Sequence, residues 1–139
     1  MRPGFTLPEL LLVLCVSAIL AGIAAPALIG MRDRITVRLA AADAARTLAD
    51  ARSVALTAAR RTAVRIDSAA GTLTVIAGAD TISTLRLESY GVELRTTRDS
   101  IAFGPTGIGW GAATATITLR RGSATTALAV SRIGRIRRA

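Results

Sequence analysis

Residues 4–9 read GFTLPE and run directly into residues 10–29, LLLVLCVSAILAGIAAPALI. This second part holds twenty residues without a charged side chain. As an α-helix with a rise of ~1.5 Å per residue, it would span roughly 30 Å, which is the thickness of the hydrocarbon core of one bilayer. We therefore expect residues 10–29 to lie in a single membrane-spanning helix.

The residues around this helix argue against a secretory signal peptide and against a plain anchor. Only residues 1–4 precede Phe5, too few for the charged and apolar regions of a signal peptide. Glu9 stands at the edge of the apolar run, where a carboxylate costs free energy and so needs a charged partner. A plain anchor would leave the conjunction of Gly4, Phe5 and Glu9 to chance, so it is the less favoured alternative.

This arrangement resembles the class III signal of type IV pilins and type II secretion pseudopilins, in which a glycine, a phenylalanine and a glutamate precede an apolar helix. The resemblance implies that residues 1–4 are a prepilin leader and that residues 5–31 are the transmembrane half of the first helix. It further implies that a prepilin peptidase cuts between Gly4 and Phe5 and N-methylates Phe5. It also implies that Glu9 meets the Phe5 amine of a neighbouring subunit during filament assembly. The expected location is the bacterial inner membrane, with the soluble part on the periplasmic side and the subunit incorporated into a pilus or pseudopilus.

Two prolines fall in this region. Pro8 would stand in the first turn of the mature helix, where its missing N–H has no intrahelical acceptor to lose. Pilins commonly have an aliphatic residue at that position. Pro26 lies deep in the apolar run and frees the carbonyl of Gly22, so we predict a helix kink near Pro26.

Composition excludes several kinds of site. The 139 residues include no His, all 18 basic residues are Arg, and the one Cys lies in the apolar helix. The usual zinc sites and a His-based catalytic triad are therefore excluded, and we expect neither a metal nor a cofactor. Of the net charge of +9, residues 100–139 contribute +6, from six Arg and no acid. Such a basic segment attracts polyanions.

The remaining sequence predicts a long helix followed by strands. Residues 32–61 contain no Gly or Pro, and their apolar residues recur at helical spacing. After Arg61 the pattern alternates, which predicts strands at residues 62–67, 72–77, 81–87, 92–95, 100–103, 115–120 and 125–131. The fold class is α+β, the pilin fold of the resembled family: a transmembrane half-helix, an amphipathic half-helix at residues 32–61, and a mostly antiparallel β domain at residues 62–139.

Residues 103–111, FGPTGIGWG, lack the features of a phosphate-binding loop, because no Lys-Ser or Lys-Thr pair follows. We expect a flexible loop between two strands, with Trp110 as a packing or surface residue. In the resembled family such loops can meet neighbouring subunits.

Residues 101–107 and 129–137 are similar to the H-type (GspH-like) minor pseudopilins of type II secretion and to FimT-like minor pilins. The first resemblance implies a non-enzymatic subunit at or near the tip of the pseudopilus, in contact with other pseudopilins and with exported proteins. The alternative is a FimT-like minor pilin that binds DNA for uptake in natural transformation. The matching basic residues are Arg135, Arg137 and Arg138, and Arg132 is adjacent to them.

Guanidinium groups without nearby acids can bind phosphates in a salt-dependent, sequence-independent way. The simpler interpretation, which we favour, is that Gly134 opens a turn and residues 135–137 are the solvated face of a last strand. Secretion is therefore the preferred function, with DNA uptake as the alternative.

An enzyme is the rival class. The soluble part has scattered carboxylates and no spacing that pairs two of them for acid and base catalysis. This class would gain support if two of them met in a deep pocket. The candidates are Asp67, Asp80, Glu88, Glu93 and Asp99.

Overall fold

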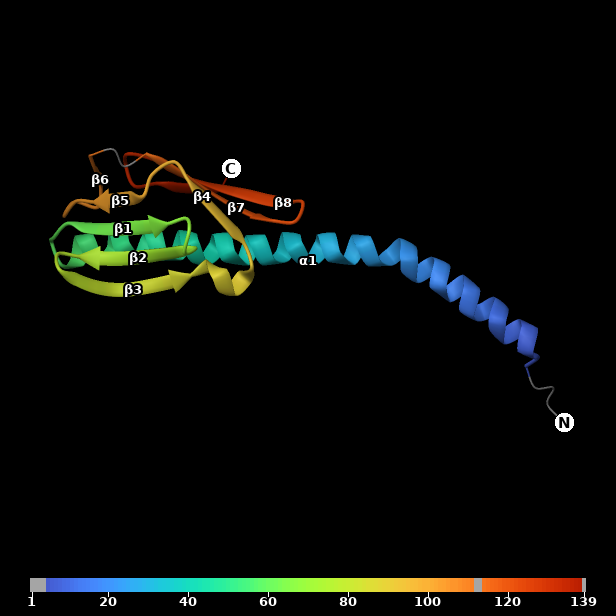
Figure 1. The fold of residues 1–139 in the computed structure, drawn as a ribbon. Helices are drawn as coiled ribbons and strands as arrows, with labels where there is room; N and C mark the ends of the chain where they lie inside the picture. Colours follow the sequence, from blue (N-terminus) through green and yellow to red (C-terminus); the bar gives the residue numbers. More distant parts are fainter. Residues whose placement is uncertain (1–4, 112–113, 139) are drawn as a thin grey trace. The chain divides into compact units, whose positions relative to one another are not determined.

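The computed structural model describes residues 5–111 and 114–138 (Figure 1). The chain divides between Arg32 and Asp33 into an N-terminal helical segment and a domain with its own core. One helix, α1 (Leu7–Thr57), contributes to both units. The predicted cleavage residue Gly4 lies outside the described residues.

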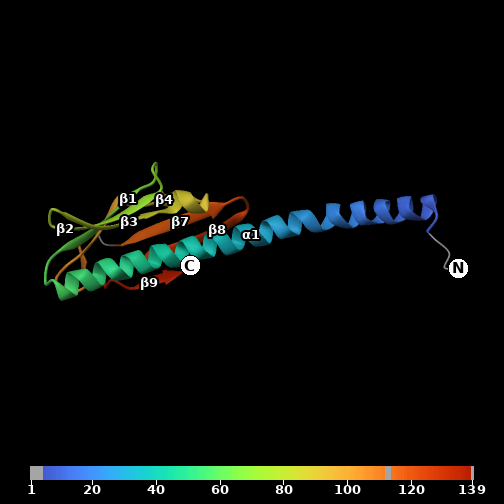
Figure 2. The same ribbon diagram turned by 90° about the horizontal axis from the view of Figure 1, so that it is seen from below.

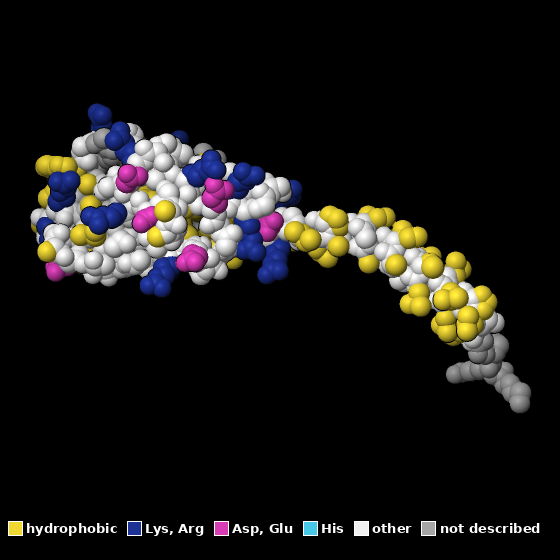
Figure 3. Space-filling view, in the orientation of Figure 1, with side chains coloured by type: hydrophobic (Ala, Val, Ile, Leu, Met, Phe, Trp, Pro, Cys, Tyr) yellow, Lys and Arg dark blue, Asp and Glu magenta, His cyan; other side chains and the backbone are white. Residues whose placement is uncertain are grey.

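The first part of α1 is apolar and exposed. Large aliphatic side chains from Leu10 to Ile29 are about half or more exposed, and Figure 3 shows hydrophobic side chains all along this part of the helix. α1 is the helix in the described residues that is long and apolar enough to cross a membrane. The helix continues through Pro26, so the proline does not end it, and the kink stays a prediction.

The domain combines the second part of α1 with two antiparallel sheets (Figures 1 and 2). The first sheet has the order β3-β2-β1-β5-β6 and the second has the order β4-β7-β8-β9. The strands are β1 (Thr62–Asp67), β2 (Thr72–Ala77), β3 (Asp80–Arg86), β4 (Glu93–Thr96), β5 (Ser100–Phe103), β6 (Gly109–Trp110), β7 (Ala115–Arg121), β8 (Ala124–Val130) and β9 (Ile136–Arg138). The α+β class predicted from the sequence, with one long helix before antiparallel strands, is confirmed.

The core lies between the two sheets and one face of α1. The helix buries mainly small side chains, which let the sheets approach it closely, and the strands bury alternate residues because successive side chains point to opposite faces. From α1 the buried residues are Val37, Ala40, Ala41, Ala44, Leu48, Ala51 and Ala55. From the strands the largest are Leu73, Ile101, Phe103, Ile117, Leu119 and Leu128.

Several boundaries differ from the sequence prediction. The helix ends at Thr57 instead of Arg61, because Ala59 adopts a left-handed conformation with φ of 47°, which stops a helix. A 3-10 helix, η1 (Leu87–Tyr90), was not predicted. The segment 103–111 is not all loop, since Gly109 and Trp110 form β6 on the edge of β5.

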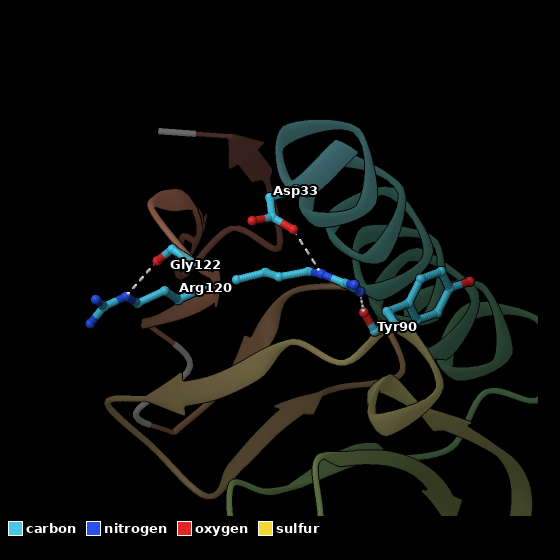
Figure 4. Close-up of polar contacts among 5 residues, drawn as sticks. Asp33, Tyr90, Arg120 and Gly122 are labelled. Carbon is cyan, nitrogen blue, oxygen red and sulfur yellow. Dashed lines mark hydrogen bonds and ion pairs between the residues drawn. The ribbon is translucent and has the colours of Figure 1, made fainter. Parts of the chain in front are cut away.

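A polar cluster joins α1 to the sheet domain near the start of its buried face (Figure 4). The Arg121 Nε lies 3.0 Å from Asp33 Oδ1, and Arg121 also donates to the backbone carbonyl of Tyr90. The Tyr90 hydroxyl in turn donates to the carboxylate of Asp43. Both ions of the Arg121–Asp33 pair are largely shielded from solvent, at 29% and 15% side-chain exposure, so the pair is screened less than a surface pair.

The pKa of Tyr90 lies above its usual value of 10.0, chiefly because its hydroxyl donates to Asp43 and also because burial and the Asp43 charge disfavour tyrosinate. A pKa that is raised in the folded state stabilises the fold below about pH 10, and this stabilisation is lost as the pH rises through the folded pKa. We therefore expect the free energy of unfolding to fall above about pH 10, and Tyr90→Phe to remove that dependence.

Because Tyr90 is the one tyrosine in the chain, its tyrosinate absorbance measures this pKa directly. The absorbance should titrate above the value found in the unfolded chain. Asp43→Asn should bring the two values closer together. A titration identical in the folded and unfolded chain would contradict the role given to Asp43.

Candidate functional site

The N-terminal signal is built on the first turn of α1. Thr6 begins the helix, since its carbonyl accepts from the backbone N–H of Glu9 and Leu10 at 3.1 and 3.2 Å. The Glu9 carboxylate reaches back to the N–H of Thr6 at 3.4 Å, a weak form of the capping-box contact. Phe5 is 78% exposed beside it. Glu9 therefore has a local contact that the sequence analysis missed, although the Thr-x-x-Glu spacing signals it.

The structure places the four C-terminal arginines on different surfaces. Arg132 lies in the turn before β9, and Arg135 directly precedes the strand. Arg138 pairs in register with the buried Leu128, whereas Arg137 pairs with Ala129. Directly paired residues share one face of a sheet. Arg138 therefore stands on the face of the core, and Arg137 stands on the outer face.

An open groove of about 790 Å³ lies between α1 and β9, and we call it the α1–β9 groove. Figure 2 shows β9 running beside the helix. Four arginines and no carboxylate stand among the described residues that line it, and its floor is aliphatic. The lining residues are Ala45, Arg46, Ala49, Arg52, Ser53, Leu56, Leu128, Gly134, Arg135, Ile136 and Arg138.

Arg52 fixes one end of this groove. Its Nε donates to the carbonyl of Gly107 at 2.8 Å, and its Nη1 lies 3.4 Å from the carbonyl of Gly134. The backbone N–H of Gly109 also donates to the carbonyl of Arg132 at 2.8 Å. Arg52 thus ties the glycine-rich loop and the turn before β9 to the helix, and so positions Arg135.

The helical residues of the groove were not singled out from the sequence. Ala45, Ala49, Arg52 and Leu56 follow the spacing i, i+4, i+7 and i+11, which places them on one flank of α1. That spacing was a usable signal. What the sequence could not show is that β9 would lie beside this flank.

Trp110 lies at the surface, 56% exposed, with the Arg61 guanidinium 6.0 Å from its ring centroid. Ile108 and Ile133 are also exposed. The hydrogen bond between their chain neighbours Gly109 and Arg132 shows that the two segments lie side by side. Of the two alternatives for Trp110, packing or surface, the structure favours the surface.

The carboxylates proposed as an enzyme's acid and base do not form a deep pocket. Glu88 and Glu93 both line a surface hollow of about 310 Å³. Glu93 is exposed and its carboxylate lies 2.7 Å from the Arg95 guanidinium. Asp80 forms an exposed ion pair with Arg60 at 3.5 Å, and Asp67 caps its own turn through the backbone N–H groups that follow.

Comparison with solved structures finds the same architecture in two kinds of filament subunit. The type IV minor pilin FimU of Pseudomonas aeruginosa superposes with a TM-score of 0.64 at 18% identity, covering 75% of this chain and 88% of FimU. The minor pseudopilin EpsH from the type 2 secretion system of Vibrio cholerae gives a TM-score of 0.60 at 14% identity, covering 74% of this chain and 95% of EpsH. No protein-family model and no curated protein sequence matches the chain.

The chain has the pilin fold. A pilin fold joins a long N-terminal helix to a β domain, and both elements occur here in that order. At these identities the likeness concerns the fold alone. The signal residues Phe5 and Glu9 and the C-terminal arginines therefore stay predictions as functional sites.

A substitution at Gly134, whose carbonyl lies near Arg52, tests how tightly the chain packs at this end of the groove. Gly134 has φ of 73°, and a Cβ there would lie 2.8 Å from the carbonyl oxygen of Gly107. We expect Gly134→Ala to lower the free energy of unfolding by more than the ~1–2 kcal/mol cost of the left-handed conformation alone. Gly111→Ala is the matched control, because Gly111 has φ of 66° but no described residue lies within 4 Å of a Cβ built there.

Thermal denaturation followed by circular dichroism would compare the two variants. Gly134→Ala should melt several degrees below Gly111→Ala. Equal melting temperatures would mean that the contact between residues 107 and 134 is loose enough to accommodate a methyl group.

Proposed function

We propose that this chain is a minor pseudopilin, a structural subunit at or near the tip of the pseudopilus of a type II secretion system. The observation that carries the proposal is the joining of the Gly4-Phe5-Glu9 signal and its apolar helix to a domain of pilin fold. An apolar helix by itself would also suit a plain membrane anchor. The domain shares its fold with EpsH, a minor pseudopilin, and with FimU, a minor pilin, and the likeness covers 74% and 75% of this chain. The Gly4-Phe5-Glu9 signal is supported by the sequence alone.

The proposed location follows from the helix. Its exposed aliphatic surface from Leu10 to Ile29 would lie in the inner membrane before assembly, with the domain on the periplasmic side. In the filament the same surface would pack against the helices of other pilins or pseudopilins. The prepilin peptidase and exported proteins are further proposed partners.

We also propose that the chain is not an enzyme. Acidic groups such as Glu93, Asp80 and Asp67 are exposed, paired with arginine or used in turns. A general acid or base needs a position beside a bound substrate, usually in an enclosed site.

Processing and assembly can be tested separately. Gly4→Ala should slow or block maturation by an active prepilin peptidase, measured by the mass of the mature chain and methylation of Phe5. Glu9→Ala should be cleaved normally but should fail to enter filaments, measured by co-purification with the other subunits. Normal maturation of the Gly4 variant would contradict the proposal.

Glu9→Gln distinguishes assembly from helix capping. A glutamine keeps an oxygen that can accept from the N–H of Thr6, but it lacks the charge. If Glu9 acts through its charge, Glu9→Gln should fail in assembly like Glu9→Ala. Recovery of assembly by Glu9→Gln would assign Glu9 to capping.

The alternative function is that of a FimT-like minor pilin that binds DNA for uptake. One observation favours it: Arg135 and Arg138 line a groove whose described lining has no carboxylate. Arg132, in the turn before β9, and Arg137, on the outer face of the sheet, are exposed outside the groove. Four guanidinium groups without acidic neighbours would neutralise phosphates.

Binding of duplex DNA by the full chain in an uncharged detergent, measured across a salt series, tests this alternative. We expect the variant with Arg135, Arg137 and Arg138 changed to Ala to lose affinity and to flatten the salt slope by roughly two to three. The control changes Arg38, Arg65 and Arg86 to Ala, which removes the same charge from other exposed positions. Equal losses in both variants would indicate binding through net charge alone.

A further inference from the structure

The α1–β9 groove combines three features that no function above uses together. Its rim carries arginines, its floor is aliphatic, and one of its walls is an edge strand. We propose that the groove binds an extended, acidic segment of a partner protein, which adds as a strand to the outer edge of β9. This inference goes beyond the proposed function and does not depend on it.

The edge of β9 is the first part of the argument. β9 stands last in the order β4-β7-β8-β9, and it pairs on one side with β8. Among the described residues no strand pairs with its other side. An edge strand presents backbone N–H and C=O groups that can pair with an added extended chain, a common mode of peptide recognition.

The charge of the rim is the second part. The guanidinium groups of Arg46, Arg135 and Arg138 make no ion pair or hydrogen bond with another residue in the described parts of the chain. Arg46 comes from α1, whereas Arg135 and Arg138 come from the other wall. Arg138 and Ile136 stand on the same face of β9, since they are two residues apart. Carboxylates on the face of an added strand that points into the groove would therefore meet arginines on both sides.

The floor decides between a peptide and a nucleic acid. Leu56, Leu128 and Ile136 line the groove together with Ala45 and Ala49. Aliphatic side chains of a peptide would bury this surface and gain from the hydrophobic effect, whereas phosphates and sugars would not. Every second side chain of an extended peptide points to the same face, so carboxylates and aliphatic groups that take turns along that face can meet the rim and the floor.

Arg52 prepares the groove for binding. Its hydrogen bonds to the carbonyls of Gly107 and Gly134 hold the turn that leads into β9. The strand edge and Arg135 therefore need little ordering when a segment binds, which lowers the entropic cost of association.

The test uses the full chain in an uncharged detergent and a fluorescent peptide of about ten residues, the Val-Glu peptide. In it Ser fills every second position, and Val and Glu take turns at the positions between, so that both point to one face. Fluorescence anisotropy should detect binding that weakens with salt, and a Val-Gln peptide should bind at least about tenfold more weakly. A Val-Glu peptide with alternate backbone nitrogens methylated keeps its charge but cannot pair as a strand. It should also lose binding.

The neighbouring arginines of β9 give a matched pair of variants. Arg138→Glu should weaken binding of the Val-Glu peptide by roughly tenfold, whereas Arg137→Glu should change it less than about twofold. Both variants alter net charge equally, but Arg137 lies on the outer face of the sheet. Arg46→Glu, on the opposite wall, should behave like Arg138→Glu, and thermal denaturation confirms that each variant is folded.

Four outcomes of the binding measurements would overturn the proposal. They are failure of the Val-Glu peptide to bind, equal losses in Arg137→Glu and Arg138→Glu, undiminished binding of the methylated peptide, and tighter binding of an oligonucleotide that Arg138→Glu abolishes. Sedimentation of the chain without peptide provides a further check. Self-association that Arg138→Glu removes would assign the groove to a second copy of the chain and would also overturn the proposal.

Discussion

The second half of α1 packs against two sheets through one narrow face, and this constraint determines how the core of the domain is built. The buried face consists of five alanines with Val37 and Leu48. These mostly small side chains let the sheets approach the helix closely but fill little of the core volume. The volume comes from the strands, through side chains such as Phe103 and Leu119. Because the buried face is narrow, both flanks of the helix stay open, and one of them forms a wall of the α1–β9 groove.

Two arginines hold the helix to the sheets at separate places. Arg121 reaches from the end of β7 to Asp33 and to the backbone of Tyr90, while Arg52 reaches from the helix to two glycine carbonyls. A guanidinium group suits both tasks, because its donors lie in a fixed planar fork and it stays charged. Packing of small side chains gives little directional preference, so these contacts define how the helix lies on the sheets.

The sequence was sufficient for the fold class because an uncharged run, a helical spacing and an alternating pattern are local signals, each predicting one element. The helix boundary was wrong where such a signal was absent, since Ala59 ends the helix without a glycine or asparagine.

The candidate site could be predicted only in part, because it depends on contacts between distant segments. Arg135 and Arg138 were visible in the basic C-terminal cluster, but the alternation of β9 puts Arg137 on the other face. Arg46 joins the site although more than 80 residues separate it from Arg135.

The way the core is packed explains the low sequence identity to FimU and EpsH. Many different sequences can form a narrow helix face of small residues and strands with alternating apolar residues. An identity of 14–18% is therefore compatible with a shared fold. The same freedom means that the core carries no information about the machine in which the chain works. Residues outside the core have to supply that information, and they include Phe5 and Glu9 near the start of α1 as well as the arginines on the flank of α1 and on β9.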